Sequence, residues 1–421
     1  MKDTIFYNSV ICRYSEIALK GKNRWKFEQF LIGRITKLLK SINSVSVSKI
    51  RGRILVNLRG FEVFSEAEIA LISDSLKRVF GLDSFSFALR VDSEINIIEN
   101  SVSSTIDKIV DKVKKQNLSF RVRARRAYKK FSFSSKEIEI KLADIVLTKY
   151  PNLTVNLKEA DVTLFIEVHK DKTYLFYDII RGEGGLPTGS NPPVLSLISG
   201  GFDSPVASYM IMRRGVFVDF LTFHSAPFTP DRTVIKIKNL VNILNKYQGN
   251  RKLFICNLLE VQKIICAETY ESLRTIFYRR YMFRLAELIA KKNNNLAIVT
   301  GESVGQVASQ TIINLANIES AIDTLVLRPL IAMDKIDIMN LAEKIGTYDV
   351  SKEQTPDSCT VFSPASPSTG AQRYKILNGE NKLNEQELVA LAYANTTVYD
   401  PETEEEMPID KYFSLINAKN L

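Results

Sequence analysis

The spacing of apolar residues predicts a first domain with the element order β-α-β-β-α-β. Apolar positions alternate along its strands and recur every three to four residues along its helices. The predicted elements are strands over residues 4–14, 45–49, 53–58 and 84–91, and helices over residues 25–39 and 67–80. This order is typical of a small ferredoxin-like α+β domain, which we place at residues 1–75.

A second α+β pattern follows at residues 76–180. Its predicted elements are helices over residues 95–115 and 135–150, and strands over residues 119–124, 161–169 and 172–180. Residues 181–193 then contain four glycines and three prolines, a composition typical of a linker.

The third part, residues 194–421, alternates short apolar strands with longer helical patterns. The clearest strands are predicted over residues 195–198, 218–223, 253–257 and 296–300. This alternation indicates a doubly wound parallel sheet. The predicted fold class is therefore α/β, with two small α+β domains before it.

The residues between the first of these strands and the next helix have the composition of a phosphate-binding turn. They read SGGFDS at positions 199–204, before a helical pattern over residues 205–214. Adjacent glycines let backbone N–H groups approach an anion, and the dipole of the following helix favours negative charge there. The spacing matches neither the GxxxxGK[ST] motif nor GxGxxG with a later acidic residue. The alternative is an ordinary helix start that Asp203 or Ser204 caps.

Further polar residues follow the other predicted strands, at the edge where open parallel sheets bind ligands. The fourth strand is followed by GESVGQVASQ at residues 301–310, whose glycines would let the backbone approach a nucleotide. Gln306 and Gln310, one turn apart, would share a helical face. A helix over residues 270–290 carries Arg279, which can neutralise phosphate charge. Taken separately, each of these patterns is more often a plain loop or a solvated arginine.

Composition limits the partners and the compartment. The 421 residues include 57 Lys and Arg against 47 Asp and Glu, a net charge of +10 that favours a polyanionic partner. Four scattered cysteines and two histidines support neither a disulfide scaffold nor a zinc site. Because no long uncharged apolar stretch is present, we expect a cytoplasmic protein without a membrane segment.

Among the cysteines, Cys359 is the candidate for chemistry. It lies in a segment rich in proline, serine and threonine, whose composition predicts a loop. A loop thiol near cationic groups is activated as the thiolate, which suits nucleophilic or sulfur-carrying chemistry. Cys12, Cys256 and Cys266 fall on strands or on an apolar helical stripe and are predicted to be small buried hydrophobes.

Two basic segments are candidates for nucleic-acid binding. If residues 121–125 form a strand, alternate arginines share one face and can follow phosphates, beside aromatic residues that can stack on bases. A solvated basic edge strand explains the same pattern. The candidate residues are Arg121, Arg123, Arg125, Arg126, Lys129 and Lys130 in this segment, and Lys20, Lys22 and Arg24 near the first predicted helix.

Over nearly the whole chain, these motifs and their order resemble the tRNA 4-thiouridine synthetases, also called tRNA sulfurtransferases. The family's ferredoxin-like opening is similar to RYSEIALKGKNR, and its RNA-binding THUMP domain to VRARRAYKKFSFSSKEI. Its later motifs follow in the same order as GEGGLPTGS, SGGFDSPVASY, FHSAPFT, TGESVGQVASQT, LRPLIAMDK and PDSCTVFSPASPST. The resemblance implies a PP-loop ATP pyrophosphatase domain over residues 194–421.

The resemblance also implies the reaction and its participants. ATP would adenylate O4 of uridine 8 in tRNA with release of pyrophosphate, and persulfide sulfur would then displace AMP at C4. Asp203 would place Mg²⁺ and the pyrophosphate, and Cys359 would handle sulfur that a cysteine desulfurase supplies. A homodimer and a further role in thiamine thiazole synthesis are also implied. The implied ATP contacts are Leu197, Ile198, Ser199, Gly200, Gly201, Ser204, Thr222, Phe223, Arg279, Gly301 and Gln310.

The chain departs from the family pattern in two places. It has no cysteine after Cys359, whereas some relatives end in a rhodanese domain with a second catalytic cysteine. We therefore expect the persulfide to form on Cys359 or to remain on the donor. Ser358 stands where many relatives have a second cysteine. Two other functions stay open: a PP-loop ligase or amidotransferase acting on a small molecule, and an RNA-binding protein whose pyrophosphatase domain is structural.

Overall fold

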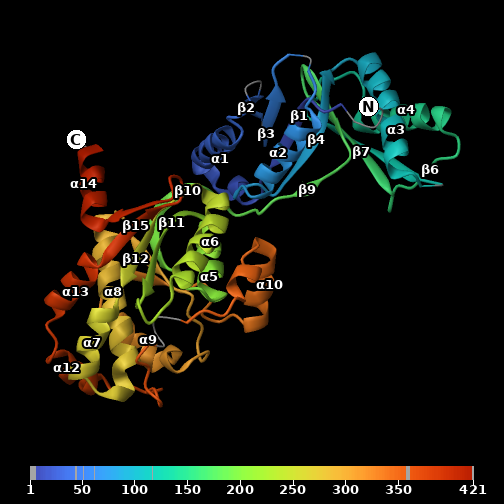
Figure 1. The fold of residues 1–421 in the computed structure, drawn as a ribbon. Helices are drawn as coiled ribbons and strands as arrows, with labels where there is room; N and C mark the ends of the chain where they lie inside the picture. Colours follow the sequence, from blue (N-terminus) through green and yellow to red (C-terminus); the bar gives the residue numbers. More distant parts are fainter. Residues whose placement is uncertain are drawn as a thin grey trace. The chain divides into compact units, whose positions relative to one another are not determined.

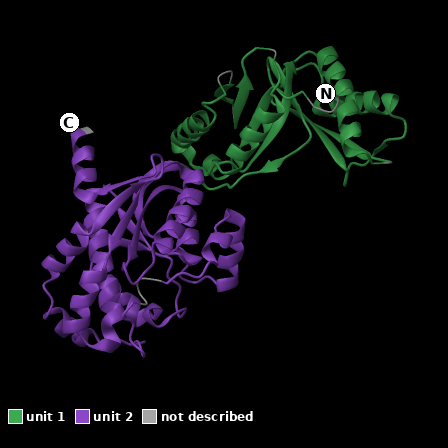
Figure 2. Ribbon diagram, in the orientation of Figure 1, with its two compact units in different colours: residues 1–187 green, residues 188–421 purple. Residues whose placement is uncertain are grey.

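The protein divides into two compact units. A computed structural model describes residues 6–42, 45–50, 52–60, 62–115, 117–356 and 361–419. Unit 1 spans Met1–Pro187 and unit 2 spans Thr188–Leu421, each with its own hydrophobic core (Figure 2). Within the described part of the chain, no helix has both the length and the hydrophobicity needed to cross a membrane.

The first half of unit 1 is an antiparallel sheet packed against two helices (Figure 1). Apolar strand residues such as Val10 and Phe85 are buried together with helix residues such as Leu31 and Leu76. The strand order is β2-β3-β1-β4, so the predicted ferredoxin-like arrangement is confirmed. The elements are β1 (Ser9–Arg13), α1 (Arg24–Leu38), β2 (Val45–Ile50), β3 (Arg53–Leu58), α2 (Glu66–Lys77) and β4 (Ser84–Asp92).

The second half of unit 1 continues the same sheet across β4. This strand pairs with β1 through residues 84–88 and with β8 through residues 89–92. The sheet runs on as β4-β8-β7-β5-β6, and β9 pairs back onto β4, so the strand predicted over residues 172–180 is two separate strands. The elements are α3 (Ile95–Val113), β5 (Ser119–Arg126), α4 (Ser135–Lys149), β6 (Thr154–Val155), β7 (Val162–Val168), β8 (Lys172–Phe176) and β9 (Ile180–Arg181).

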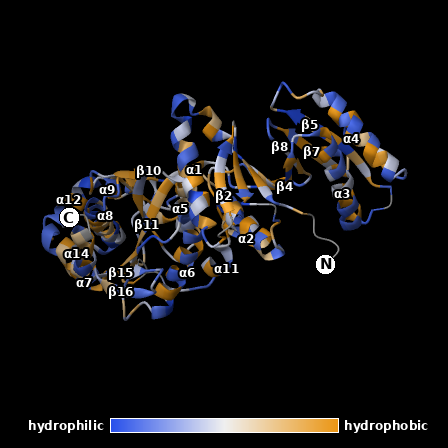
Figure 3. Ribbon diagram, turned by 90° about the horizontal axis from the view of Figure 1, so that it is seen from above, coloured by the Kyte–Doolittle hydropathy of each residue, from blue (hydrophilic) through white to orange (hydrophobic). Residues whose placement is uncertain are grey.

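Unit 2 is built on a sheet with the order β14-β13-β10-β11-β12-β15-β16. The pairs β10–β13, β11–β12 and β13–β14 are parallel, as predicted, whereas β15 and β16 pair antiparallel at one edge. Hydrophobic residues concentrate on the strands and on the helices that cover them (Figure 3). The strands are β10 (Leu186–Leu197), β11 (Arg214–His224), β12 (Leu253–Asn257), β13 (Ala297–Val299), β14 (Leu325–Leu327), β15 (Thr396–Asp400) and β16 (Glu405–Pro408). The helices are α5 (Asp203–Met212), α6 (Asp231–Gln248), α7 (Leu259–Glu268), α8 (Arg274–Lys292), α9 (Ile312–Glu319), α10 (Lys335–Ile345), α11 (Tyr348–Ser351), α12 (Arg373–Glu380), α13 (Glu385–Ala394) and α14 (Ile409–Lys419).

β10 begins inside the segment whose composition predicts a linker. The strand spans Leu186–Leu197 and includes Pro192 and Pro193. Proline cannot donate a backbone hydrogen bond, so a strand tolerates it only where the neighbouring strand does not need that donor. Gly184, with φ of 64°, belongs to the turn before the strand. The composition therefore predicts a linker, whereas residues 186–193 form the first part of a strand.

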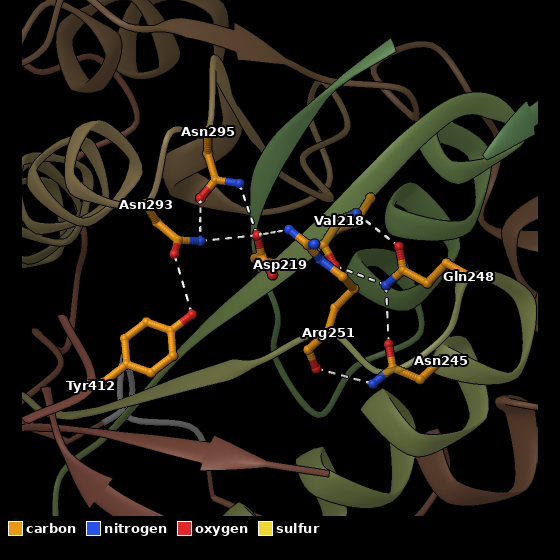
Figure 4. A network of polar contacts seen from close by, with 8 residues as sticks. All are labelled: Val218, Asp219, Asn245, Gln248, Arg251, Asn293, Asn295 and Tyr412. Atoms are coloured by element: carbon orange, nitrogen blue, oxygen red, sulfur yellow. Dashed lines mark hydrogen bonds and ion pairs between the residues drawn. The ribbon is translucent and has the colours of Figure 1, made fainter. Parts of the chain in front are cut away.

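A buried carboxylate, Asp219 of β11, joins three segments of unit 2 (Figure 4). Asp219 is 2% exposed and accepts hydrogen bonds from Arg251, from Asn293 (3.0 Å) and from Asn295 (2.9 Å). The two asparagines directly follow α8, and Arg251 precedes β12. Asp219 therefore fixes the end of α8 and the start of β12 against β11.

Replacing Asp219 with alanine is expected to lower the free energy of unfolding of unit 2 by about 3 kcal/mol, because Arg251 and two amides lose a buried acceptor. Urea denaturation followed by circular dichroism measures this change. The chain's single tryptophan, Trp25, lies in unit 1, so its fluorescence transition should stay unchanged. The control Asp349→Asn removes an exposed ion pair with Lys352 and should move neither transition. Wild-type stability of Asp219→Ala would contradict the role of this network.

Candidate functional site

One cavity of unit 2, of about 970 Å³, lies where β10, β11 and β13 end. This is the edge at which parallel sheets bind ligands. The residues for which the resemblance implies a contact with ATP all line this cavity, although they come from distant parts of the chain. They are Leu197, Ile198, Ser199, Gly200, Gly201, Ser204, Thr222, Phe223, Arg279, Gly301 and Gln310, and Asp203 lines the same cavity.

The SGGFDS turn between β10 and α5 is held by its own serine side chains. Ser204 Oγ accepts a hydrogen bond from Ser199 N (2.8 Å), and Ser199 Oγ accepts one from Gly201 N (3.4 Å). α5 begins without a side-chain cap, so neither Asp203 nor Ser204 takes the capping role that the sequence left open. The first N–H groups of such a helix form a favourable site for an anion.

Two glycines of the site are required by close approach rather than by backbone angles. An added Cβ at Gly301 would lie 2.6 Å from Ser204 N and 2.7 Å from the Asp203 carbonyl carbon. An added Cβ at Gly200 would lie 3.2 Å from Lys236 Nζ. Neither glycine has a positive φ. The glycines therefore provide space for neighbouring protein atoms, whereas the sequence argument used them to let the backbone approach a phosphate or a nucleotide.

Asp203 is contacted by two side chains at the edge of the cavity. Its Oδ1 is 2.7 Å from Lys335 Nζ, and its Oδ2 accepts a hydrogen bond from Gln306 Nε2 (3.1 Å). Lys335 begins α10 and stands in the LRPLIAMDK motif, but sequence reasoning gave it no role. The contact places an ammonium group beside the carboxylate at the start of α5.

Arg279 of α8 is held at the cavity wall by the buried carboxylate of Glu302. Glu302 is 4% exposed and accepts hydrogen bonds from Arg279 Nη1 (2.6 Å), Arg328 Nε (2.8 Å) and Thr300 Oγ1 (2.9 Å). Burial alone would lower the pKa of Arg328, but Glu302 and Glu319 raise it above its ordinary value. Sequence reasoning missed Glu302, although it lies in the TGESVGQVASQT motif. The network fixes the Arg279 guanidinium in one position.

Another part of the lining suits a planar base. Leu197, Phe223, Met282 and Phe283 contribute apolar surface to the cavity. Thr222 is 1% exposed, and its Oγ1 has no hydrogen-bond partner among the residues that the structure describes. A ligand that supplies the missing partner explains a buried hydroxyl at a cavity wall. Together with the phosphate-binding turn, this lining fits ATP.

The cavity offers few ligands for a metal ion. Across the described ranges, no group of three or more His, Cys, Asp or Glu side chains could hold one. The Asp203 carboxylate contacts Lys335 and Gln306. In nucleotide sites, Mg²⁺ is commonly held by one or two carboxylates together with substrate phosphates. The residues therefore fit an ion that arrives with ATP better than a resident ion.

The cysteines that the sequence predicts to be small hydrophobes are buried or partly buried. Cys12 and Cys256 are 0% exposed, and burial raises the pKa of each thiol to about 12. Cys266 is partly buried, with its Sγ 2.8 Å from Tyr278 Oη. With so high a pKa, the Cys12 and Cys256 thiols are poor nucleophiles at neutral pH. Cys359 lies outside the described residues, so its role stays a prediction.

Some basic candidates of unit 1 donate hydrogen bonds to protein acceptors, and some have exposed side chains. Arg121 and Arg126 donate hydrogen bonds to backbone carbonyls of neighbouring loops, and Arg24 donates to Glu28 Oε1 (2.8 Å). Lys20 Nζ lies 3.6 Å from Oε1 of Glu16, four residues earlier in the chain. The exposed candidates are Lys22, Arg123, Arg125, Lys129 and Lys130. Of these, Arg123 also donates a hydrogen bond to Leu157 O (3.2 Å).

The predicted common face of the β5 arginines is confirmed by the burial of the residues between them. Phe120 and Val122 are buried in the core of the second half of unit 1, so Arg121, Arg123 and Arg125 lie on the opposite face. Beyond the short pairing with β6 at residues 119–120, the described ladder of β5 is with β7 alone. These cations are therefore near a sheet edge, where a polyanion has access.

Comparisons with known proteins match both units. Family models match as the ThiI ferredoxin-like domain at residues 9–86, the THUMP domain at residues 83–178 and the Thiamine biosynthesis protein (ThiI) at residues 189–385. A "Probable tRNA sulfurtransferase" of Alkaliphilus oremlandii is 41% identical over 387 residues, which cover 91% of this chain and 96% of that protein. A protein of the same name from Brevibacillus brevis is 37% identical over 392 residues, covering 93% and 96%.

Two solved structures resemble the protein in fold. The crystal structure of a 4-thiouridine synthetase and RNA complex with bound ATP has a TM-score of 0.85 and 33% sequence identity, covering 94% of this chain and 99% of that chain. The crystal structure of PH1313 from Pyrococcus horikoshii has a TM-score of 0.64 and 25% identity, covering 80% and 99%. Both similarities extend over more than one unit of the chain.

Proposed function

The chain belongs to the tRNA sulfurtransferase family, and from this we propose that it converts uridine 8 of tRNA to 4-thiouridine in the cavity of unit 2. The observation that carries the proposal is the convergence of the candidate ATP residues on one cavity beside the phosphate-binding turn. ATP bound to the similar 4-thiouridine synthetase supports the same assignment.

The first step activates the uracil. O4 attacks the α-phosphorus of ATP, and pyrophosphate leaves with the electron pair of the broken P–O bond. The turn at residues 199–204 binds the phosphates through backbone N–H groups, and Arg279 and Lys335 compensate charge that develops on the leaving group. Mg²⁺, placed by Asp203, neutralises further phosphate charge when it is bound.

The second step replaces oxygen with sulfur. The terminal sulfur of a persulfide attacks C4 of the activated uracil, the C4–O4 bond breaks, and AMP leaves with O4. The uracil is then joined to the carrier cysteine by a disulfide. An external thiol, such as the cysteine of the assay, attacks the carrier sulfur, the S–S bond breaks, and 4-thiouridine leaves as the thiolate. A second thiol then reduces the disulfide left on the carrier. Adenylation is needed because it makes a poor oxygen leaving group a good one before the nucleophile arrives. We assign the persulfide to Cys359 and its sulfur to a cysteine desulfurase.

The exposed cations of unit 1 are proposed to bind the tRNA backbone. Arg123 and Arg125 on β5, with Lys129 and Lys130 after it, give a line of positive charge at a sheet edge. Lys22 extends the same role to the start of α1. Arg24, Arg121 and Arg126 are partly buried and donate to protein acceptors, so we expect them to contribute less to RNA binding. Arg123 stays exposed, although it donates to Leu157 O.

Three further proposals rest on family membership. The first is a homodimer in which one subunit presents tRNA to the cavity of the other. The second is a cytoplasmic location. The third is a role as sulfur carrier for thiamine thiazole synthesis, which the name of the matching family model supports.

The proposed function is tested by incubating the purified full chain with unmodified tRNA, ATP, Mg²⁺, cysteine and a cysteine desulfurase. We expect 4-thiouridine, followed by its near-ultraviolet absorbance, together with AMP, and both should require tRNA and ATP. AMP without 4-thiouridine would mean that the acceptor or the sulfur source is wrong. Bound tRNA without AMP would favour an RNA-binding protein, and AMP formed with small molecules alone would favour a small-molecule ligase.

The double substitution Arg123→Ala and Arg125→Ala is expected to weaken tRNA binding about tenfold at moderate salt. It should also reduce the slope of log affinity against log salt by about 2, because two phosphate contacts are lost. Binding measured at several salt concentrations gives both values. Lys37→Ala, which removes an exposed cation of α1, is the control. An unchanged slope in the double variant would show that this face does not contact phosphates.

A further inference from the structure

Lys236 of α6 is a buried cation that lines the cavity and has no role in the mechanism above. It is 4% exposed. Its side chain lies against the phosphate-binding turn, because an added Cβ at Gly200 would be 3.2 Å from Lys236 Nζ and 3.3 Å from its Cδ and Cε. Lysine is almost never this buried unless its charge has a partner.

The partners of Lys236 among the described residues are backbone carbonyls. Its Nζ donates hydrogen bonds to Ser351 O (3.0 Å) and Glu353 O (2.6 Å). Burial lowers the pKa of Lys236, and the negative charge of Glu353 acts in the opposite direction. Neutral carbonyls compensate a buried charge only in part. An anion entering the cavity beside Lys236 would therefore be attracted to its ammonium group.

The segment that Lys236 holds, residues 351–356, also contacts the phosphate-binding turn. Ser351 Oγ donates a hydrogen bond to Gly201 O (3.3 Å), and Thr233 Oγ1 of α6 donates one to Pro356 O (3.4 Å). Residues 351–356 form part of the cavity lining. In the sequence, Pro356 precedes Cys359 by three positions. Lys236 thus connects the turn that binds phosphate with the segment that leads to the candidate sulfur carrier.

We propose that Lys236 is an ATP-binding residue that contacts a phosphate beyond the α-phosphate and exchanges its two carbonyl partners for that phosphate. The inference rests on the proposed ATP site. A charged phosphate oxygen is a stronger acceptor than a neutral carbonyl, so ATP drives the exchange. AMP lacks the β- and γ-phosphates and leaves Lys236 on residues 351–356. The contacts of this segment then differ before and after pyrophosphate departs, which links the two halves of the reaction.

The first test compares ATP and AMP binding to the full chain by isothermal titration calorimetry. Lys236→Met is expected to weaken ATP binding by about 10- to 100-fold and AMP binding by less than about 3-fold, because only ATP loses a charge-assisted contact. Lys236→Arg keeps the charge and should restore most of the ATP affinity. Lys246→Met, at an exposed lysine of the same helix, is the matched control and should bind both nucleotides as the wild type does.

The second test measures hydrogen exchange of the backbone amides over residues 348–356. In the wild type, ATP should change the exchange rates of this segment and AMP should not. In Lys236→Met, the response to ATP should disappear.

The inference is overturned if Lys236→Met weakens ATP and AMP binding equally, as a purely structural lysine would, or weakens neither. A normal exchange response to ATP in Lys236→Met would overturn the coupling. A wild type that binds neither nucleotide would overturn the proposed function as well, so the two failures are distinguishable.

Discussion

Cys359→Ser is expected to abolish 4-thiouridine formation, with a loss of at least about 10³-fold in the rate of sulfur transfer. A serine hydroxyl cannot carry a persulfide, so no sulfur nucleophile is available at this position. AMP formation should persist, since O4 of uracil, not the thiol, attacks ATP in the first step. Both products are measured in one reaction, AMP by chromatography and 4-thiouridine by absorbance.

Cys266→Ser is the matched control for this experiment. The Cys266 side chain is partly buried, and a hydroxyl in its place can keep the contact with Tyr278 Oη. This variant should form both products at wild-type rates. If Cys359→Ser also formed 4-thiouridine at the wild-type rate, the persulfide would have to stay on the desulfurase and attack the activated uracil directly.

The helices that the sequence predicts follow from local side-chain patterns. The helix predicted over residues 135–150 is α4, Ser135–Lys149. Its start is fixed by a capping box, in which Ser134 and Glu137 satisfy each other's backbone N–H groups. Signals of this kind lie within four residues, so they are visible before any tertiary contact is known.

The contacts that organise the cavity join residues that are far apart in the chain. The phosphate-binding turn is a local motif and could be predicted. The contact of Lys335 with Asp203 spans 132 residues, and that of Lys236 with Ser351 spans 115. Lys335 stands in a family motif, but the sequence around neither lysine shows which distant group it contacts. Only the packing of α6 and α10 beside α5 identifies them.

The basic surface of unit 1 could also be predicted only in part. A sequence shows which residues can donate hydrogen bonds but not which acceptors they meet. Arg121 and Arg126 count as two cations in the sequence, yet the structure gives backbone carbonyls to both. Arg24 is likewise engaged with Glu28. Arg123 also donates to a backbone carbonyl, that of Leu157, but Arg123 and Arg125 stay exposed, as the period of a strand predicts.

Gly301→Ala is expected to lower kcat/KM for ATP by about 10²-fold or more, because small displacements of reacting groups have effects of this size. The added Cβ would lie 2.6 Å from Ser204 N and 2.7 Å from the Asp203 carbonyl carbon. Both are backbone atoms in the first turn of α5, and they cannot rotate away as a side chain can. Either α5 or the loop after β13 must shift, and the phosphate-binding turn shifts with it.

Steady-state AMP formation at varied ATP concentrations measures this effect, and two comparisons separate it from unfolding. Gly370→Ala is the control in the same unit, since an added Cβ there meets nothing within 4 Å and φ is not positive. The affinity of Gly301→Ala for tRNA should match the wild type, because we assign tRNA binding to unit 1. A wild-type kcat/KM in Gly301→Ala would show that the turn tolerates the shift. The close packing of Gly301 on α5 would then not be what positions the phosphates of ATP.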